Sequence, residues 1–190
     1  MYNRHQVGHL SRQKIRIRSY VSAGLSFLEV KTKNNHGRTK KKRVTMEQFD
    51  ALHPQHGIQF HRQDENFVNY DEFLRTYLHY DPERLTEQIE NRFDRITLVN
   101  KAKTERLTID TNLRFHNIAT GNYRFMDHIV IIELKRDGRV ASPILTLLNQ
   151  LRIKPLGFSK YCIGSALTNS DLHCNRLKPR LHSIDRILAA

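Results

Sequence analysis

The chain is strongly basic and long enough for one folded domain. It has 190 residues, of which 32 are Lys or Arg and 19 are Asp or Glu, so its formal net charge is +13. This length suits a single domain with a substantial core and is too short for two large domains. The charge predicts an anionic partner, but it does not choose among nucleic acid, an acidic membrane surface and small phosphates.

Composition also limits the class and the location. Hydrophobic residues make up 38% of the chain, which favours a folded domain over disorder. Cys162 and Cys174 form neither a disulfide framework nor a zinc motif, so we expect free thiols in a reducing compartment. No apolar run approaches the roughly 20 residues of a membrane span, and the N-terminus lacks a hydrophobic signal region. We therefore expect a cytoplasmic protein; a membrane-protein partner and the oligomeric state stay open.

A β-hairpin is the first element predicted after a polar lead-in, residues 1–15. Its strands are residues 16–20 and 27–33, joined by a turn that contains Gly24. Side chains alternate across a strand, so one face of this hairpin is charged while the reverse of its second strand is apolar. The residues predicted to share the charged face are Arg16, Arg18, Tyr20, Glu29, Lys31 and Lys33.

The basic run at residues 38–44 follows a strong turn signal at residues 34–37. Such a run is often a solvated loop or a localisation signal. Its place one turn after a basic strand makes a third strand at least as good an interpretation. In that case either Lys41 or Lys42 shares the charged face, depending on the register.

Residues 45–85 are interpreted as a helical excursion between sheet segments. The run Thr45-Met46-Glu47-Gln48 is typical of a capped helix start, and residues 69–78 predict a second helix before Pro82. The histidines of this segment lack the spacing of metal ligands on a helix, so we interpret them as surface imidazoles.

Three later runs, residues 93–99, 105–112 and 130–135, again predict strands. Glu133 and Lys135 share a face of the third run. A helix over residues 143–151, a segment at 159–164 and a C-terminal helix within 172–190 follow. The polar residues that strict alternation places on one side of the second run are Arg106, Thr108, Asp110, Asn112 and Arg114.

These patterns predict an α+β fold built on an antiparallel β-barrel. Closing the sheet turns its charged face inward and leaves helices outside. A basic tunnel needs a bound anion, because burying an unpaired ion is costly, and a polyphosphate chain offers many closely spaced acceptors. Glu29 and Glu133 would then hold Mg²⁺ or Mn²⁺, which prefer oxygen ligands. The alternative is that each carboxylate pairs with Lys or Arg across the strands.

Six motifs in order over residues 16–164 resemble the VTC domain, the polyphosphate polymerase branch of the CYTH-like triphosphate tunnel metalloenzymes. The resemblance implies a tunnel in which basic residues grip the phosphates of ATP, Mn²⁺ or Mg²⁺ is held by a carboxylate, and the γ-phosphate passes to a polyphosphate chain. The motifs are RIRSY (16–20), FLEVK (27–31), GRT with the basic run after it (37–43), ERLTID (105–110), IELK (132–135) and SKYCIG (159–164).

Residue roles follow from this resemblance. It implies that Glu133 is the metal ligand and that Lys160 closes the ring of phosphate contacts near the tunnel mouth. Alternation alone places Tyr20, Lys33, Asp110 and Lys135 on the inner faces of the strands, and Glu29 is a second candidate for the metal. The remaining residues implied to bind phosphate are Arg16, Arg18, Lys31, Arg106 and Arg114, with Lys41 or Lys42 as a further contact.

Only fifteen residues precede Arg16, where the family normally has a further basic strand, so we expect a barrel that is incomplete at the N-terminus. The leading hypothesis is a polyphosphate polymerase, or a triphosphatase if water replaces the acceptor chain. A module that binds polyphosphate without turnover is the alternative. A nucleic-acid binder is disfavoured, because the sequence contains no recognised nucleic-acid motif or exposed aromatic stacking pair. A missing nucleophile set is expected, since phosphoryl transfer depends mainly on positioning and charge neutralisation.

Overall fold

A computed structural model describes residues 2–46, 70–138 and 141–189. The fold is α+β, and its sheets are antiparallel as predicted. The chain forms two compact units, Met1–Thr86 and Glu87–Ala190, which we call unit 1 and unit 2. Each is described by itself, and whether they make up a single domain stays a prediction.

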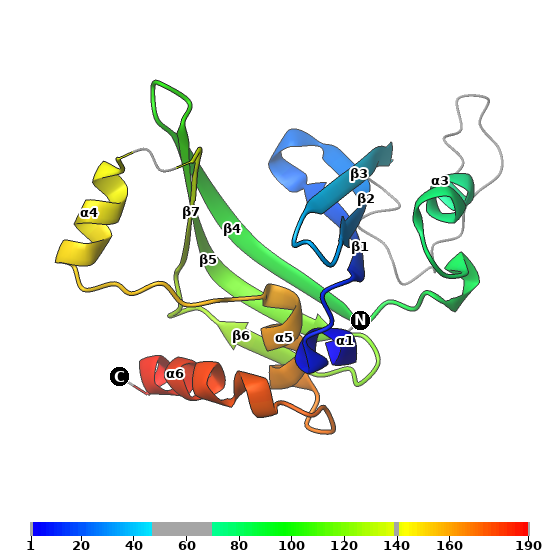
Figure 1. Ribbon diagram of the computed structural model, residues 1–190. Coiled ribbons are helices and arrows are strands. Elements are labelled where there is room, and N and C mark those ends of the chain that lie inside the picture. Colours follow the sequence, from blue (N-terminus) through cyan, green and yellow to red (C-terminus); the bar gives the residue numbers. More distant parts are fainter. Residues whose placement is uncertain (1, 47–69, 139–140, 190) are drawn as a thin grey trace. The chain divides into compact units, whose positions relative to one another are not determined.

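Unit 1 contains a three-stranded sheet with the order β1-β2-β3 (Figure 1). Its strands are β1 (Arg12–Tyr20), β2 (Leu25–Lys33) and β3 (Thr39–Met46). The turn between β1 and β2 is a 3-10 helix, η1 (Val21–Ala23), which ends at Gly24 with φ 62°. A left-handed residue is easiest for glycine, so the sequence closes this turn without strain. The basic run at residues 38–44 forms most of β3, so it is a third strand and not a loop.

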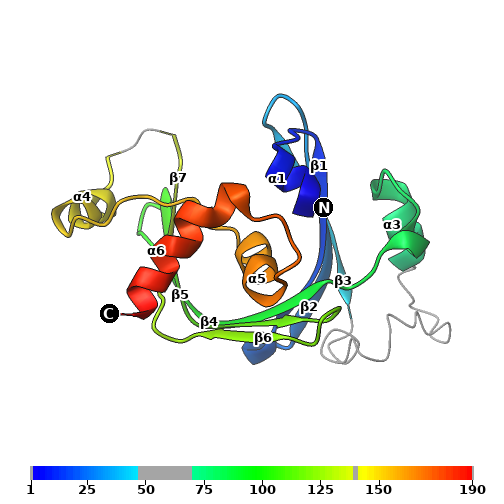
Figure 2. The same ribbon diagram turned by 90° about the horizontal axis from the view of Figure 1, so that it is seen from below.

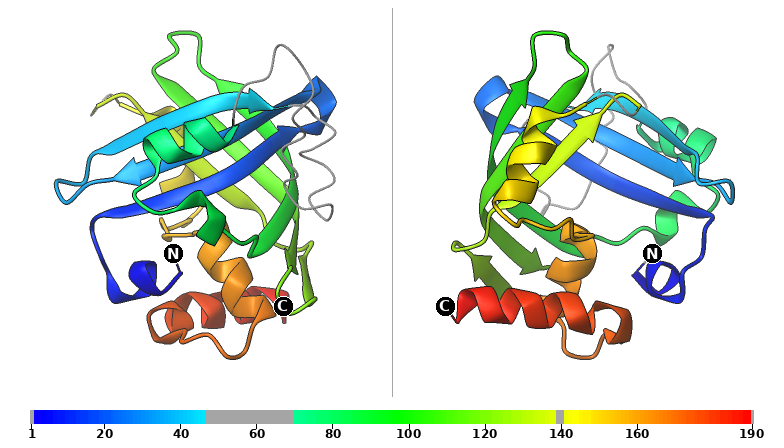
Figure 3. Two further views of the ribbon diagram at one scale, coloured as in Figure 1. Left: turned by 90° about the vertical axis from the view of Figure 1, so that its right-hand side faces the viewer. Right: turned by 60° about the vertical axis from the view of Figure 1, so that its left-hand side comes forward.

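Helix α3 (Tyr70–Tyr77) lies along one face of this sheet, as the left-hand view of Figure 3 shows. Tyr70 and Leu74 of this helix, with Leu78 directly after its end, follow helical spacing. They pack on the apolar side of β2 and β3, and the alternation predicted for β2 is confirmed. The buried residues of this core are Leu28, Val30, Met46, Tyr70, Leu74 and Leu78.

Gln13 fixes the end of α3 to the sheet. Its Nε2 donates hydrogen bonds to Thr32 Oγ1 at 2.9 Å and to the Tyr77 carbonyl oxygen at 2.7 Å. Its Oε1 accepts from the backbone N–H of His79 at 2.9 Å. Because Gln13 is buried, these bonds satisfy polar groups that would otherwise be costly inside the unit.

Two predictions for unit 1 need correction. The lead-in contains a short helix, α1 (Tyr2–Val7), and β1 already begins at Arg12. The helix start expected at residues 45–48 is wrong for Thr45 and Met46, which continue β3, because pairing with Phe27 and Ser26 extends the ladder. The rest of that predicted helix start, with the three histidines at 53, 56 and 61, lies outside the described residues. The predicted helix over 69–78 is confirmed by α3, and a short η3 (Pro82–Arg84) follows it.

Unit 2 is built on a second antiparallel sheet in which β5 is central. Its strands are β4 (Ile89–Val99), β5 (Glu105–Asn117), β6 (Tyr123–Met126) and β7 (Ile131–Arg136). β4 pairs with one side of β5, while β6 and β7 pair with different stretches of its other side. The three strands expected in this region are present, and β6 is an addition that the sequence patterns did not predict.

A β-bulge interrupts the alternation of β5. Arg92 pairs with Arg114 but Asp94 pairs with Thr111, and Asn112 has φ 53°. Asparagine tolerates this left-handed conformation, and an extra residue on one strand exchanges the faces of everything beyond it. Paired residues point to the same side, so Arg114 shares its side with Thr111 and lies opposite Asp110. The prediction that Arg106, Asp110 and Arg114 share one face is therefore wrong for Arg114.

Helix α5 (Lys160–Thr168) lies on the concave side of the unit 2 sheet (Figure 2). Ser159 caps it by accepting from the Cys162 backbone N–H at 3.4 Å. Gly164 sets how closely the helix approaches, because a Cβ there would lie 2.4 Å from Cδ1 of Phe115. The fully buried residues of this core are Leu113, Phe115, Met126, Cys162 and Ile163.

The remaining helices of unit 2 are α4 (Pro143–Gln150), η4 (Asn175–Leu177) and α6 (Lys178–Leu188). They match the helices expected at 143–151 and within 172–190. Both cysteines are free thiols. Within the described residues, no helix combines the length and the apolar character needed to cross a membrane.

Candidate functional site

The sheet of unit 1 has one strongly cationic face, opposite the face that α3 covers. The strand register arranges it in cross-strand rows. Lys14, Lys31 and Lys41 form one row, and Arg16, Glu29 and Arg43 form the next. Lys33 and Arg18 lie on the same face at its two ends. We call these residues the basic face; among the described strands of unit 1, Glu29 supplies its single carboxylate.

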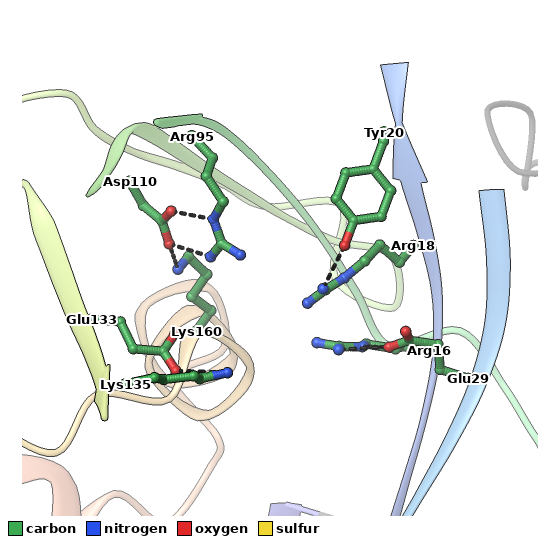
Figure 4. A network of polar contacts seen from close by, with 9 residues as sticks. All are labelled: Arg16, Arg18, Tyr20, Glu29, Arg95, Asp110, Glu133, Lys135 and Lys160. Carbon is green, nitrogen blue, oxygen red and sulfur yellow. Dashed lines mark hydrogen bonds and ion pairs between the residues drawn. The ribbon is translucent and has the colours of Figure 1, made fainter. Parts of the chain in front are cut away.

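Glu29 is buried to 2% exposure between two cations of neighbouring strands. Arg16 Nη2 lies 2.6 Å from Oε2, and Lys41 Nζ lies 2.5 Å from Oε1 (Figure 4 shows the contact with Arg16). Burial alone would raise the pKa of Glu29, but the hydrogen bonds from Lys41 and Arg16 outweigh it and lower the pKa below its usual value. Glu29 is therefore ionised at neutral pH and holds three strands together.

The register also decides between Lys41 and Lys42. Lys41 pairs with Lys31 and contacts Glu29, so it belongs to the basic face. Lys42 pairs with Val30 and lies on the other side, where its Nζ is 5.3 Å from the ring centroid of Tyr77. Lys42 therefore takes part in packing α3 and is not placed with the phosphate-binding candidates.

Aromatic side chains occupy one end of the basic face. Tyr20 and Phe27 meet edge to face, with ring centroids 6.2 Å apart. Arg18 donates a hydrogen bond to the Tyr20 hydroxyl at 2.9 Å (Figure 4), and the guanidinium of Arg43 lies 4.7 Å from the Phe27 centroid. The sequence prediction included Tyr20 and Arg18 but missed Phe27 and Arg43. Phe27 is two residues from Glu29 and Arg43 is two residues from Lys41, so the two-residue period of the strands places both on the basic face. We call these four residues the aromatic end.

Unit 2 carries a separate charged cluster around Asp110. Arg95 Nε and Nη2 donate to its two carboxylate oxygens at 2.6 and 2.7 Å, and Lys160 of α5 donates to Oδ2 (Figure 4). The ring of Phe93 lies beneath both cations: its centroid is 5.1 Å from Arg95 Cζ and 4.3 Å from Lys160 Nζ. Burial alone would raise the pKa of Asp110, but the bonds from Arg95 and Lys160 lower it overall.

Sequence reasoning placed Lys160 among the phosphate contacts and Asp110 on an inner strand face, but it did not find Arg95 or Phe93. The signal was present, since Phe93, Arg95 and Thr97 alternate along β4 in the same way as Arg16 and Arg18 along β1. The structure adds that the carboxylate of Asp110 is already shared by two cations. These cations are thereby held in fixed positions on the concave side of the sheet.

The same side of the sheet continues toward the start of β5 and the end of β7. Glu133 pairs with Thr108, and Lys135 pairs with Arg106. Glu133 is half exposed and its Oε1 lies 3.3 Å from Lys135 Nζ (Figure 4). Thr108 is buried, and its hydroxyl has no hydrogen-bond partner among the residues that the structure describes. Arg114, in contrast, lies on the opposite side of the sheet, 5.8 Å from the ring centroid of Phe125.

The carboxylates differ in what they offer a metal ion. Both oxygens of Glu29 are engaged by Arg16 and Lys41, which matches the cross-strand pairing considered as its alternative role. Glu133 has solvent-accessible oxygen and lies beside the unpartnered hydroxyl of Thr108, so these two residues offer hard oxygen ligands. In the described parts of the chain, no three His, Cys, Asp or Glu side chains gather into a metal cluster.

Both units thus present cationic sheet faces whose few carboxylates position Lys and Arg side chains, an arrangement typical of proteins that bind polyanions. The family model of the VTC domain matches residues 1–169, and the chain belongs to that family. The resemblance found in the motifs is therefore confirmed. The family is related to polyphosphate polymerases and to the triphosphate tunnel enzymes, which are typically metal-dependent. A comparison with curated proteins finds no match.

Proposed function

We propose that this VTC domain binds ATP and inorganic polyphosphate on its cationic sheet faces and transfers the γ-phosphate of ATP to the end of a polyphosphate chain. The family resemblance implies a triphosphate tunnel whose basic residues hold the phosphates, and the proposal assigns that role to the Lys and Arg side chains of each face. Positioning and charge neutralisation dominate phosphoryl transfer, so the chain needs cations in fixed places more than it needs a nucleophile.

The directly opposed pair of Lys31 and Lys41 is the observation that carries the proposal. Directly opposed residues on neighbouring strands have Cβ atoms about 4.5–5.5 Å apart, and like charges at that distance destabilise the sheet. Arg16 and Arg43 add charge in the next row, and Glu29 compensates for only part of it. A bound polyphosphate removes the repulsion, because each charge-assisted hydrogen bond is worth about 1.5–3 kcal/mol.

A divalent metal fits the proposal at Glu133. Its half-exposed carboxylate and the unpartnered hydroxyl of Thr108 would hold Mn²⁺ or Mg²⁺, while Glu29 is excluded by its two cations. The metal, when bound, neutralises charge on the phosphate oxygens. Arg106 and Lys135, which pair beside these residues, orient the phosphates, and Arg95 and Lys160 do so from the Asp110 cluster.

Binding is tested with a matched pair of lysine variants. Lys31→Ala removes a cation from the basic face, whereas Lys42→Ala removes one from the side that packs against α3. We expect Lys31→Ala to weaken polyphosphate binding roughly tenfold and Lys42→Ala to leave it within about twofold. Equal losses in the two variants would show that only net charge matters and would refute a defined face.

Catalysis is tested with Mn²⁺ and γ-labelled ATP by separating labelled polymer, free phosphate and unchanged nucleotide. Label in polymer that disappears in Glu133→Ala supports the polymerase, and label in free phosphate supports a triphosphatase. If the folded protein binds polyphosphate without turnover, the polymerase proposal fails and a binding module remains. The binding-module function is favoured by one observation: the carboxylates of Glu29 and Asp110 are both engaged by cations, so they position Lys and Arg side chains.

A further inference from the structure

We infer that the aromatic end of the basic face, formed by Phe27 and Tyr20 with Arg18 and Arg43, binds the base of a nucleoside triphosphate whose phosphates lie on the lysine and arginine rows. The inference rests on the proposed function and adds a base-binding subsite to it. All of its residues belong to the single sheet of unit 1.

The basic face is asymmetric along its strands. Lysines dominate one end, in the rows of Lys14 and Lys33, whereas the other end has Phe27 between Arg18 and Thr45. Two residues of a strand span roughly 6.6–6.8 Å, so the Phe27 row lies about that far from the Arg16–Glu29–Arg43 row. An extended nucleotide laid along the face places its base at the aromatic end when its phosphates occupy the arginine and lysine rows.

A chain of phosphates has no group that stacks on an aromatic ring. Inorganic polyphosphate offers oxygen atoms, which guanidinium and ammonium groups bind, while an aromatic ring offers only its π-face. Nucleobases do stack on such rings, and arginine beside the ring strengthens the contact through cation–π attraction. The Arg43 guanidinium, which lies over the Phe27 ring at 4.7 Å from its centroid, supplies that cation.

The contacts within the aromatic end keep these groups in place. Tyr20 braces Phe27 from its edge, and its hydroxyl accepts from Arg18, which holds that guanidinium beside the arginine row. Tyr20 is still 40% exposed, and Leu25, opposite Tyr20 in the register, is exposed as well. Apolar surface is thus available where the base would lie.

The test compares ATP with inorganic tripolyphosphate, which carries the same chain of three phosphates without base or sugar. Titration calorimetry on the full chain measures both ligands with wild type, Phe27→Leu and Phe125→Leu. Leucine keeps an apolar side chain on the strand but removes the ring. Phe125 is the matched control, because it is an exposed strand phenylalanine of unit 2 that also lies beside an arginine.

We expect Phe27→Leu to raise the Kd for ATP roughly tenfold, as loss of one base stack would, with tripolyphosphate binding unchanged within about twofold. Phe125→Leu should alter neither. Equal changes for the two ligands, or no change for ATP, would overturn the inference while leaving phosphate binding intact. If wild type binds neither ligand, the proposed function itself fails and the subsite with it.

A second measurement does not depend on any variant being folded. In wild-type protein, saturation of the phenylalanine and tyrosine ring protons in an NMR experiment should transfer to the adenine protons of bound ATP. GTP should bind about as tightly as ATP, and UTP more weakly, because a pyrimidine has the smaller π-surface. Binding of ATP without transfer to its base would overturn the inference.

Discussion

Removing the carboxylate of Asp110 should destabilise unit 2 more than any other single change to its charged residues. Asp110 is 1% exposed and receives hydrogen bonds from Arg95 and Lys160, whose side chains are only 25% and 19% exposed. Breaking a buried ion pair by deleting one partner costs about 3–5 kcal/mol, since the remaining charge is left uncompensated. We therefore expect Asp110→Ala to lower the free energy of unfolding by about that amount.

Urea denaturation followed by circular dichroism measures this change, and Glu133→Ala is the control. Glu133 is half exposed and makes one ion pair with Lys135 at 3.3 Å, so its removal should cost less than about 1 kcal/mol. A loss for Asp110→Ala no larger than for the control would refute the reasoning that burial of the triad makes it structurally important.

The pH dependence of the same experiment has a definite sign. The folded-state pKa of Asp110 is lowered, so its contribution is complete above the pKa of the unfolded chain, near 3.8, and is lost as the pH falls through the folded-state value. The stability difference between wild type and Asp110→Ala should therefore be constant near neutral pH and shrink below about pH 4. A difference that grew on acidification would contradict a lowered pKa of Asp110 in the folded state.

Polyphosphate binding should become tighter in Asp110→Ala, because Arg95 and Lys160 lose the anion that neutralises them.

Three other predictions test the remaining contacts. Gly164→Ala should destabilise the protein by about 1–3 kcal/mol in urea denaturation, because its Cβ would overlap the Phe115 ring, and full stability would contradict that close approach. Gln13→Leu should cost about 1–3 kcal/mol by leaving the Tyr77 carbonyl without its donor, measured in the same way; a neutral change would show that water replaces it. Glu29→Gln should tighten polyphosphate binding and steepen its salt dependence, because Arg16 and Lys41 lose the anion that competes with the phosphates, and it should lower stability by about 1–2 kcal/mol, since Lys41 is 41% exposed and partly screened. Weaker binding in a calorimetric titration would refute this competition and show that Glu29 contributes more by positioning the two cations.

The site of unit 1 was largely predictable because local alternation decided it. Arg16 and Arg18, with Glu29 and Lys31, lie on one face as the two-residue period of the strands indicated. The reverse face is apolar as expected, and α3 covers it. Membership of the VTC domain family was also evident from motifs that each lie within a single strand, a turn and the strand after it, or the start of a helix.

Tertiary structure decided every feature that depends on how one strand or helix meets another. The choice of Lys41 over Lys42 required the register of β3 against β2. A register shifted by one residue would put Lys42, and not Lys41, on the face of Glu29. The bulge at Asn112 moved Arg114 to the far side of the sheet, and strict alternation has no sign of such an insertion. Asp110 and Lys160 are fifty residues apart, so their contact follows only from α5 packing on the sheet.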